Sequence, residues 1–507
     1  MNDKQRDRIE RWGRRVRLAV TLGCSVAVLG GCDDLLDVDL PAKLTDAALE
    51  SPQGAKTIRN SVIGEFESAW DYMMWAHHGL EDGGEIILGS PGIHRGGFTW
   101  QTRPQNWFPH MQSSRRFGEI LHEKLSQDWT VADVPDRGEY MAVASMYQGA
   151  AIGLMGMTLC EVTVNVGALM TVDATLALAE TYLTRAISEI DAVGDFPMPF
   201  GIASSTKAMA LGLRAQVRWA KGDLAGASSD AQLVPQDFLA YVTRDTGPFR
   251  RNKAYFDGVL TRYAFLYPIN DWWTADPTKA PGSEINPVTG MAWPDAIPFT
   301  GYANLGILPD GRAVWDDTGH PIRIDAAPGQ TEGKYRLPIE DTAVEDHRVD
   351  HHWGTTQGQS FPSYYVGKYT SESENIPLVN WEEMVLIRAE AAGGQGAIDM
   401  VNVLRAAEGL PLVTYADPGN SEQIRYMIIE ERRRALYVEG RYYFTKLKNL
   451  DLLWFPRDEG TQFSGRNTYG GGVRMIMPDS EFELNPNLGL TDRATGCPQH
   501  ERPVNFI

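Results

Sequence analysis

Apolar residues recur every three or four positions along two separate parts of the chain. Ile58, Val62, Phe66 and Ala69 show this spacing, which is typical of one face of an amphipathic helix. We expect this helix to begin near Thr45-Asp46, because both residues are good N-caps. Similar patterns predict further helices over residues 106–129, 138–161, 173–192, 205–221, 380–392, 397–408 and 421–439.

These helices are expected to pair along the chain, 106–129 with 138–161 and 173–192 with 205–221. Gly222-Asp223 is a turn signal at the end of the last of these segments. Small residues around it, such as Ala215 and Ala227, would let two helices approach closely. This arrangement is typical of a tetratricopeptide-like helix hairpin.

Helical periodicity is lost between residues 247 and 377, where Pro, Gly, Asp and aromatic residues are frequent. The segment is too long for a simple linker, so we interpret it as an inserted, loop-rich subdomain. The sequence therefore predicts a mainly α fold, a tetratricopeptide-like helical-pair scaffold with a large loop-rich insertion. Its expected parts are a leader over 1–31, an N-terminal helical part over 32–246, the insertion over 247–377 and a C-terminal helical part over 378–507.

The N-terminus has the pattern of an export signal. Seven Lys and Arg residues precede an apolar run from Leu18 to Leu29, which is too short to span a bilayer. Leu29-Gly30-Gly31-Cys32 follows, and it resembles the bacterial lipobox, in which the Cys is lipidated and becomes the first residue. We expect lipidation at Cys32; a plain signal peptide and an uncleaved N-terminal anchor are the alternatives.

The chain after the leader is acidic overall. The net charge of the whole chain is −19, and residues 1–31 carry +4, which leaves −23 on the remainder. Nucleic-acid binding depends on neutralising phosphates with Lys and Arg, so we expect no nucleic-acid partner. Cys160 and Cys497 could form one disulfide in an exported protein, but the apolar run before Cys160 favours a buried free thiol.

Catalytic motifs are not apparent in the sequence. His347, His351 and His352 lie near Asp346 and Asp350, and His77-His78 lies near three acidic residues. Such groups can bind metal, but we do not expect a metal site at either place. Glycoside hydrolysis uses two carboxyl groups in different roles, such as a general acid and a general base. Adjacent carboxylates such as Asp316 and Asp317 rarely take up two such roles. We therefore expect a protein that is not an enzyme and that needs no cofactor; a glycoside hydrolase is the alternative.

Tryptophan is the better candidate for ligand contact. Flat indole faces pack on sugar or peptide surfaces, while the N–H stays available for a polar contact. A tryptophan in an irregular polar segment is less often part of a hydrophobic core than one on a helix. The alternative is that these tryptophans form a small core of the insertion itself. The candidates are Trp272, Trp273, Trp293, Trp315 and Trp353 in the insertion, with Trp100 and Trp107 flanking a shorter loop.

Four motifs occur in the order found in one family of bacterial lipoproteins. The first is an acidic segment after Cys32 that leads to Leu44-Thr45-Asp46. The others are a helix with Glu383 and Ala389-Glu390-Ala391, followed by Asn402, Arg405 and Gly409-Leu410; the segment Glu431-Arg432-Arg433 with Glu439-Gly440-Arg441; and Pro478 with Glu481 and Asn485-Pro486-Asn487. From the residues alone we interpret these motifs as structural, with Glu431 and Arg432–Arg434 forming ion pairs on a helix face.

Together the motifs resemble the SusD/RagB family of outer-membrane nutrient-binding lipoproteins. Ala435, Thr445 and Asn380 depart from the family pattern. The resemblance implies a lipid-anchored protein at the bacterial cell surface that binds oligosaccharide or peptide and passes it to a SusC-like, TonB-dependent outer-membrane transporter. A scaffold that binds only protein is a further alternative.

Overall fold

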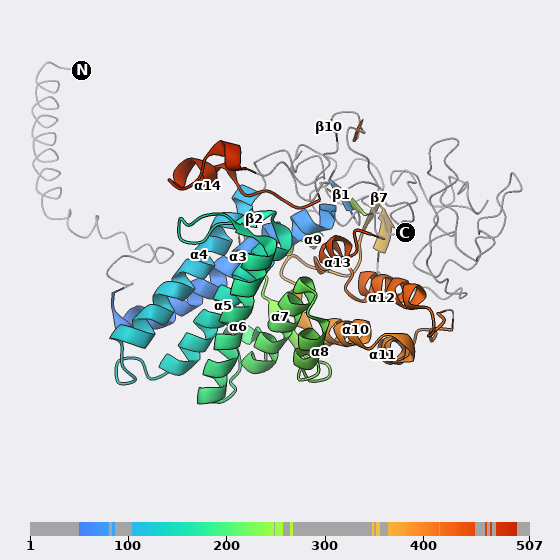
Figure 1. Cartoon of the computed structure of the whole chain (residues 1–507), viewed down its shortest axis with the longest axis horizontal. Coiled ribbons are helices and arrows are strands. Elements are labelled where there is room, and N and C mark those ends of the chain that lie inside the picture. The colour runs from blue at the N-terminus through green and yellow to red at the C-terminus, as the bar shows by residue number, and fades with distance from the viewer. Residues whose placement is uncertain are drawn as a thin grey trace, which may run out of the picture. The chain divides into compact units, whose positions relative to one another are not determined.

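The computed structural model describes residues 50–80, 84–86, 104–247, 249–256, 264–266, 347–348, 351–354, 363–414, 416–451, 462–463, 467–468 and 473–493. The chain divides into two compact units, Met1–Gly54 and Ala55–Ile507. Within the first unit, the described residues form the short 3-10 turn η1 (Pro52–Gly54). The second unit contains all the other elements and is mainly helical (Figure 1).

The first half of the second unit is an array of antiparallel helices. They are α3 (Ala55–Leu80), α4 (Pro104–Glu123) with its π-helical extension η3 (Lys124–Asp128), α5 (Arg137–Thr158), α6 (Val172–Val193), α7 (Thr206–Lys221) and α8 (Leu224–Ala231), with the 3-10 turn η4 (Pro199–Gly201) before α7. The predicted pairing of neighbours is confirmed, and Figure 1 shows α4, α5, α6 and α7 side by side. The predicted start near Thr45 lies outside the described residues; within them the first α-helix begins at Ala55.

Local sequence explains where these helices begin and end. The hydroxyl of Thr171 accepts a hydrogen bond from the amide of Ala174, and Ser205 does the same for Ala208. Gly222 ends α7 with a left-handed φ of 86°. Asp223 then caps α8 by accepting from the amide of Gly226. The predicted Gly222-Asp223 turn is therefore confirmed.

Three glycines on α5 allow α6 and α7 to pack directly against its backbone. A Cβ at Gly149 would lie 2.6 Å from Leu183 Cγ, and one at Gly153 would lie 2.8 Å from Val217 Cγ2. Real Cβ atoms do not approach so closely, so a side chain at either position would push the neighbouring helix away. Because α5 also packs against α3 and α4, nearly all of its residues are buried.

The second half continues the helical scaffold. Its helices are α10 (Trp381–Ala392), α11 (Gly394–Ala407), α12 (Ser421–Ala435), α13 (Tyr442–Lys448) and α14 (Asp479–Leu484), with η6 (Leu490–Asp492) near the end of the described chain. Helix α12 stops at Ala435, four residues before its expected end. A tight turn with positive φ at Val438 and Gly440 follows, and it starts α13 in a new direction.

Short strand pairs connect the helices. They are β1 (Gly84–Ile86) with β5 (Ala264–Leu266), β2 (Glu161–Val162) with β3 (Met170–Thr171), β4 (Leu239–Val242) with β8 (Ile376–Asn380), β6 (His351–Gly354) with β7 (Ser363–Val366) and β9 (Gln462–Phe463) with β10 (Asn467–Thr468). The one-turn helix α9 (Lys253–Tyr255) follows β4. The antiparallel pair β4–β8 places the two ends of segment 247–377 next to each other, so a long insertion can leave and re-enter the scaffold at one point.

The helices enclose a large main core and a smaller one between α10, α11 and α12. Within the part of the chain that the structure describes, no helix combines the length and apolar character needed to cross a membrane.

Candidate functional site

The structure places two of the seven candidate tryptophans. Trp107 lies on the first turns of α4, whose start at Pro104 follows the preference for Pro at the first helical position. The helix predicted over residues 106–129 is confirmed here, but the Trp107 side chain is fully buried in the main core, so Trp107 is a core residue and not a ligand contact. Trp353 lies in β6, opposite Tyr364 of β7. Trp100, Trp272, Trp273, Trp293 and Trp315 lie outside the described residues.

The beginning of the insertion is fixed by a buried carboxylate of α3. Glu67 Oε1 accepts hydrogen bonds from the amide and the hydroxyl of Thr243, at 2.7 and 2.6 Å. Arg250 pairs with the second carboxylate oxygen, and Arg244 donates to the Glu67 carbonyl at 2.5 Å. Glu67 is only 2% exposed, and these hydrogen bonds and the ion pair offset the free-energy cost of burying its charge.

The two ends of the insertion are also bonded to each other. Asn252 donates through its side chain to the carbonyl of Glu374, and its amide donates to Glu372. The Asn375 side chain accepts from the amide of Arg244 at 2.8 Å. Together with β4–β8, these bonds join the two ends of segment 247–377 into a closed stem.

Buried charges hold the returning half of the insertion to the C-terminal helices. Arg348 lies 2.5 Å from Glu431 of α12, which also pairs with Arg405 of α11 at 3.2 Å. Lys368 lies 2.8 Å from Glu439, which also accepts from the side chain of Asn380. Burial raises the pKa of Glu439, and Lys368 opposes that shift.

A second buried cluster centres on Glu383 of α10. Its carboxylate pairs with Arg432 at 3.1 Å and with Arg441 at 3.7 Å, and it accepts from Gln216 of α7 at 2.7 Å. These motif residues are thus structural cross-links between helices. The sequence interpretation placed such pairs on a helix face; the structure buries Glu431 and Arg432 almost completely.

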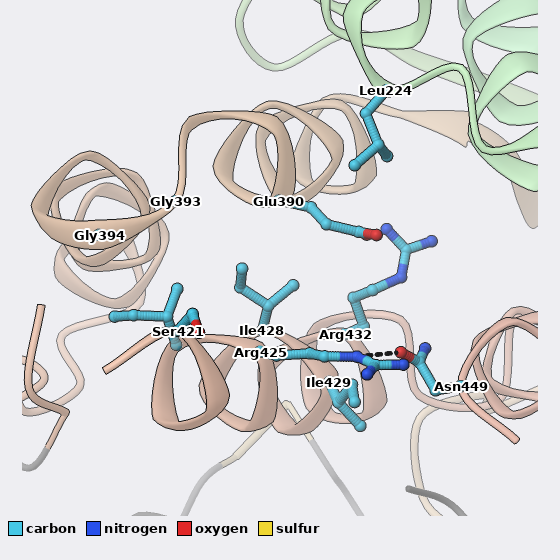
Figure 2. Close-up of a pocket in the computed structure, with 11 residues that line it drawn as sticks. Leu224, Glu390, Gly393, Gly394, Ser421, Arg425, Ile428, Ile429, Arg432 and Asn449 are labelled. Atoms are coloured by element: carbon cyan, nitrogen blue, oxygen red, sulfur yellow. Dashed lines mark hydrogen bonds between the residues drawn. The ribbon is translucent and has the colours of Figure 1, made fainter. Parts of the chain in front are cut away.

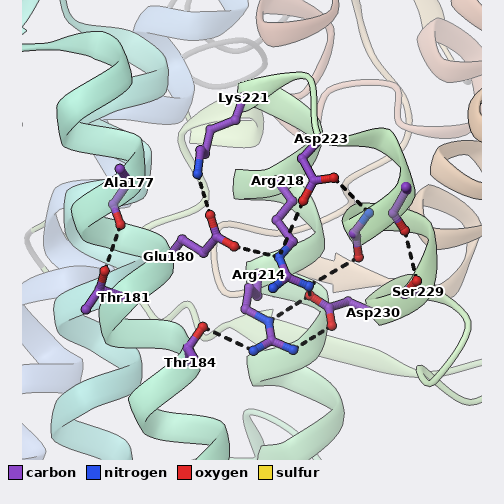
Figure 3. Close-up of polar contacts among 12 residues, drawn as sticks. Ala177, Glu180, Thr181, Thr184, Arg214, Arg218, Lys221, Asp223, Ser229 and Asp230 are labelled. Carbon is purple, nitrogen blue, oxygen red and sulfur yellow. Dashed lines mark hydrogen bonds and ion pairs between the residues drawn. The ribbon is translucent and has the colours of Figure 1, made fainter.

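A third, partly exposed cluster joins α6, α7 and α8 (Figure 3). Asp230 accepts from Arg214 at 2.6 and 2.7 Å and from Arg218 at 3.0 Å. Glu180 pairs with Arg218 at 2.8 Å and with Lys221 at 2.5 Å. All of these charges are satisfied within the cluster, so it has the character of a structural contact.

A cavity of about 280 Å³ lies among α8, α10, α12 and the end of α13 (Figure 2). One face of α12 lines it with Ser421, Ile424, Arg425, Ile428, Ile429 and Arg432. Leu224, Glu390, Gly393, Gly394 and Asn449 complete the lining. This cavity was not predicted from the sequence. The pattern that could have indicated it is the apolar face of α12, which ends in arginines.

The cavity wall carries several charges. Trp219 donates through its indole N–H to Glu390 at 2.6 Å, and Lys448 lies 3.6 Å from the same carboxylate. Arg425 forms a bidentate pair with Asp451 at 2.6 Å. Burial lowers the pKa of Arg432, while Glu383 and Glu390 favour its charged form.

One terminal nitrogen of Arg432, Nη1, is buried and has no acceptor among the described residues. Arg432 otherwise donates through Nε to Thr445 and through Nη2 to Glu383, and its guanidinium lies 4.2 Å from the Trp219 ring centre. A buried donor without an acceptor costs roughly 1–3 kcal/mol.

Histidines and cysteines were also candidates. The His347 side chain pairs with Glu408 at 3.0 Å, while Asp346 and Asp350 lie outside the described residues. Over the described ranges, no group of three or more His, Cys, Asp and Glu residues could hold a metal ion. Cys160 is disulfide-bonded, so the interpretation as a free thiol was wrong. The other cysteines, Cys24, Cys32 and Cys497, all lie outside the described residues.

Comparison with known proteins identifies the fold. No protein-family model matches the chain, and no curated protein matches it in sequence. Solved structures do match it. A SusD-like carbohydrate-binding protein from Bacteroides vulgatus aligns with a TM-score of 0.57 at 12% identity, over 86% of this chain and 97% of that one.

Two further structures agree. A putative sugar-binding protein from Bacteroides vulgatus gives a TM-score of 0.54 at 12% identity, with 89% and 99% of the two chains covered. A SusD-like carbohydrate-binding protein from Bacteroides fragilis gives 0.53 at 13% identity, with 87% and 100% covered. The mainly helical chain therefore has the fold of the SusD-like proteins, as its motifs predict.

Proposed function

We propose that this chain is a surface-exposed lipoprotein that binds oligosaccharides or peptides and delivers them to a SusC-like, TonB-dependent outer-membrane transporter. Catalysis is not part of the proposed role, and no cofactor is required. The observation that carries the proposal is the SusD-like scaffold with a closed stem at β4–β8, from which a tryptophan-rich insertion extends.

The stem supports a ligand-binding role for the insertion. Glu67 fixes its outgoing strand to α3, while Arg348 and Lys368 fix its return to α12 and the turn after it. A loop region held at both ends can present side chains in a defined arrangement. We propose Trp100, Trp272, Trp273, Trp293, Trp315 and Trp353 as the ligand contacts, and we leave out Trp107 because it is buried.

The N-terminus supports the proposed location. A lipid on Cys32 carries more than one acyl chain, and two chains suffice for stable attachment to a membrane. The anchor would hold the binding domain beside the transporter. Capture followed by release requires modest affinity, with a Kd of roughly micromolar to millimolar, or about −8 to −4 kcal/mol.

Calorimetry with glycan and peptide pools tests the binding role. We expect saturable binding of one pool by the chain from residue 33 onward, and weaker binding after Trp→Ala changes in the insertion. Trp381→Ala is the matched control, because Trp381 starts α10 on the scaffold. Absence of binding to every pool, or equal loss in the control, would contradict the proposal.

The delivery role needs a separate test in native membranes. We expect an affinity-tagged full chain to co-purify with a TonB-dependent transporter, and intact-mass analysis to find a lipid on Cys32 and residues 1–31 removed. A chain that keeps residues 1–31, or that purifies without a transporter, would contradict the delivery model while leaving ligand binding to be judged by calorimetry.

A further inference from the structure

The cavity along α12 is a feature of the scaffold and not of the insertion. Its lining residues come from α8, α10, α12, the α10–α11 junction and the end of α13. Its volume of about 280 Å³ is close to the lower end of the range for small-molecule sites. The proposed role of the insertion tryptophans does not use it.

The cavity offers an apolar surface to an aliphatic group. Ile424 and Ile428 lie one turn apart on α12 and both line the cavity. Leu224 of α8 lies across the cavity from Ile428 (Figure 2). Gly393 and Gly394 also line the cavity. Because they have no side chains, a ligand could lie close to the backbone there. Among the residues that the structure describes, no aromatic side chain lines the cavity, in contrast to the indole faces that favour sugars.

The charges around the cavity favour an anion. The charged residues that line it are Arg425, Arg432 and Glu390, two cations and one carboxylate. Three separate sets of ion pairs involve them, Arg425 with Asp451, Arg432 and Arg441 with Glu383, and Lys448 with Glu390. Together these sets contain four cations and three carboxylates, so the positive charge exceeds the negative by one. Nη1 of Arg432, whose side chain is 2% exposed, also lacks an acceptor among the residues described.

We propose that this cavity binds a carboxylate carried on an aliphatic body. The carboxylate would lie toward Arg432 and Arg425, where it supplies the missing acceptor and balances the extra positive charge. The aliphatic body would cover Ile424, Ile428 and Leu224. Such a group occurs in free short-chain carboxylates and at the C-terminus of peptides that end in an aliphatic residue.

Calorimetric titration of the whole mature chain tests this site. Sodium hexanoate represents the free carboxylates, N-acetyl-leucine represents a peptide C-terminus, and hexanol is the uncharged probe. We expect one-site binding of at least one carboxylate, about tenfold tighter than hexanol. The bound carboxylate should also raise the Tm, because it binds only the folded chain. The tighter of the two carboxylates identifies the source.

Substitutions locate the site. Arg425→Gln and Leu224→Phe should each weaken carboxylate binding about tenfold, the first by removing a charge and the second by filling space. Arg116→Gln on α4 and Leu233→Phe after α8 are matched controls, because both residues are exposed and neither lines the cavity. Circular dichroism confirms that each variant is folded.

Three results would overturn the proposal. These are no binding of either carboxylate, binding of hexanol as tight as that of hexanoate, and carboxylate binding that the two cavity variants leave unchanged. None of them bears on glycan or peptide capture by the insertion, which the tryptophan variants test separately.

Discussion

Loss of the Glu431 charge should destabilise the C-terminal half of the scaffold strongly. Glu431 has a side chain 1% exposed, and it lies between Arg348 and Arg405, which are 9% and 2% exposed. Glu431→Gln keeps the size of the side chain but removes the charge that both guanidinium groups share. Breaking a buried ion pair by removing one of its charges costs about 3–5 kcal/mol.

A less buried control is available in Glu119. It also lies between two arginines, Arg115 at 3.0 Å and Arg116 at 2.8 Å, but its side chain is 28% exposed and that of Arg116 is 51% exposed. Arg115 is 6% exposed, but it keeps hydrogen bonds to Gln112 and Asn165 when the Glu119 charge is removed, so Glu119→Gln should cost only about 1 kcal/mol.

Urea unfolding followed by far-UV circular dichroism measures the free energy of unfolding for both variants. We expect Glu431→Gln to lose several times more stability than Glu119→Gln. If the two losses are equal, the buried pairs do not hold the insertion's return to α11 and α12, and our explanation of the motif is refuted.

Three further predictions address the core, the disulfide and the pH dependence. Trp107→Ala should lower the free energy of unfolding by about 3–5 kcal/mol in urea denaturation, because it empties a fully buried site; a loss below about 1 kcal/mol would place Trp107 outside the core. Peptide mapping without reduction should find Cys160 joined to Cys497, since Cys32 is expected to carry lipid; a free Cys497 thiol would contradict this pairing. Burial raises the pKa of Glu439 in the folded chain, despite Lys368, so folding favours its protonated form. Glu439 therefore contributes to stability at acid pH, and this contribution is lost as the pH rises from its pKa in the unfolded chain through its raised pKa in the folded chain. Over this pH range, Glu439→Gln should reduce the pH dependence of the free energy of unfolding measured in urea. An unchanged pH dependence would refute the assignment.

Sequence patterns predicted the helices well because their signals are local. The cap at Ser205, the turn at Gly222 and the apolar spacing from Ile58 to Ala69 each depend on residues a few positions apart. Boundaries were less exact. Helix α12 was expected to continue to residue 439, because nothing in its local sequence shows that the chain must turn after Ala435 to bring α13 alongside.

Long-range features could not be derived from spacing alone. The pairing of β4 with β8 joins segments more than a hundred residues apart, and the disulfide of Cys160 depends on a partner far along the chain. The burial of charges could not be predicted either. Glu431 has the character of a surface residue in the sequence, and it is buried because α11 and Arg348 cover it. Glu67 carried a detectable signal, because it is an acidic residue among the apolar residues Phe66, Ala69 and Trp70.

Trp107 shows why residue type alone is a weak guide to a binding site. It lies at the start of a helix that the sequence predicts, and the sequence does not show that this face of the helix packs into the main core. The other candidate tryptophans remain predictions that depend on the surroundings of each side chain.

Calorimetric titration of the mature chain with glycan and peptide pools tests directly whether the insertion captures a ligand. We expect saturable binding of one pool, with a Kd of roughly micromolar to millimolar, that is weakened by Trp→Ala changes in the insertion and kept in Trp381→Ala. Binding that survives removal of all the insertion tryptophans, or no binding to any glycan or peptide, would contradict it.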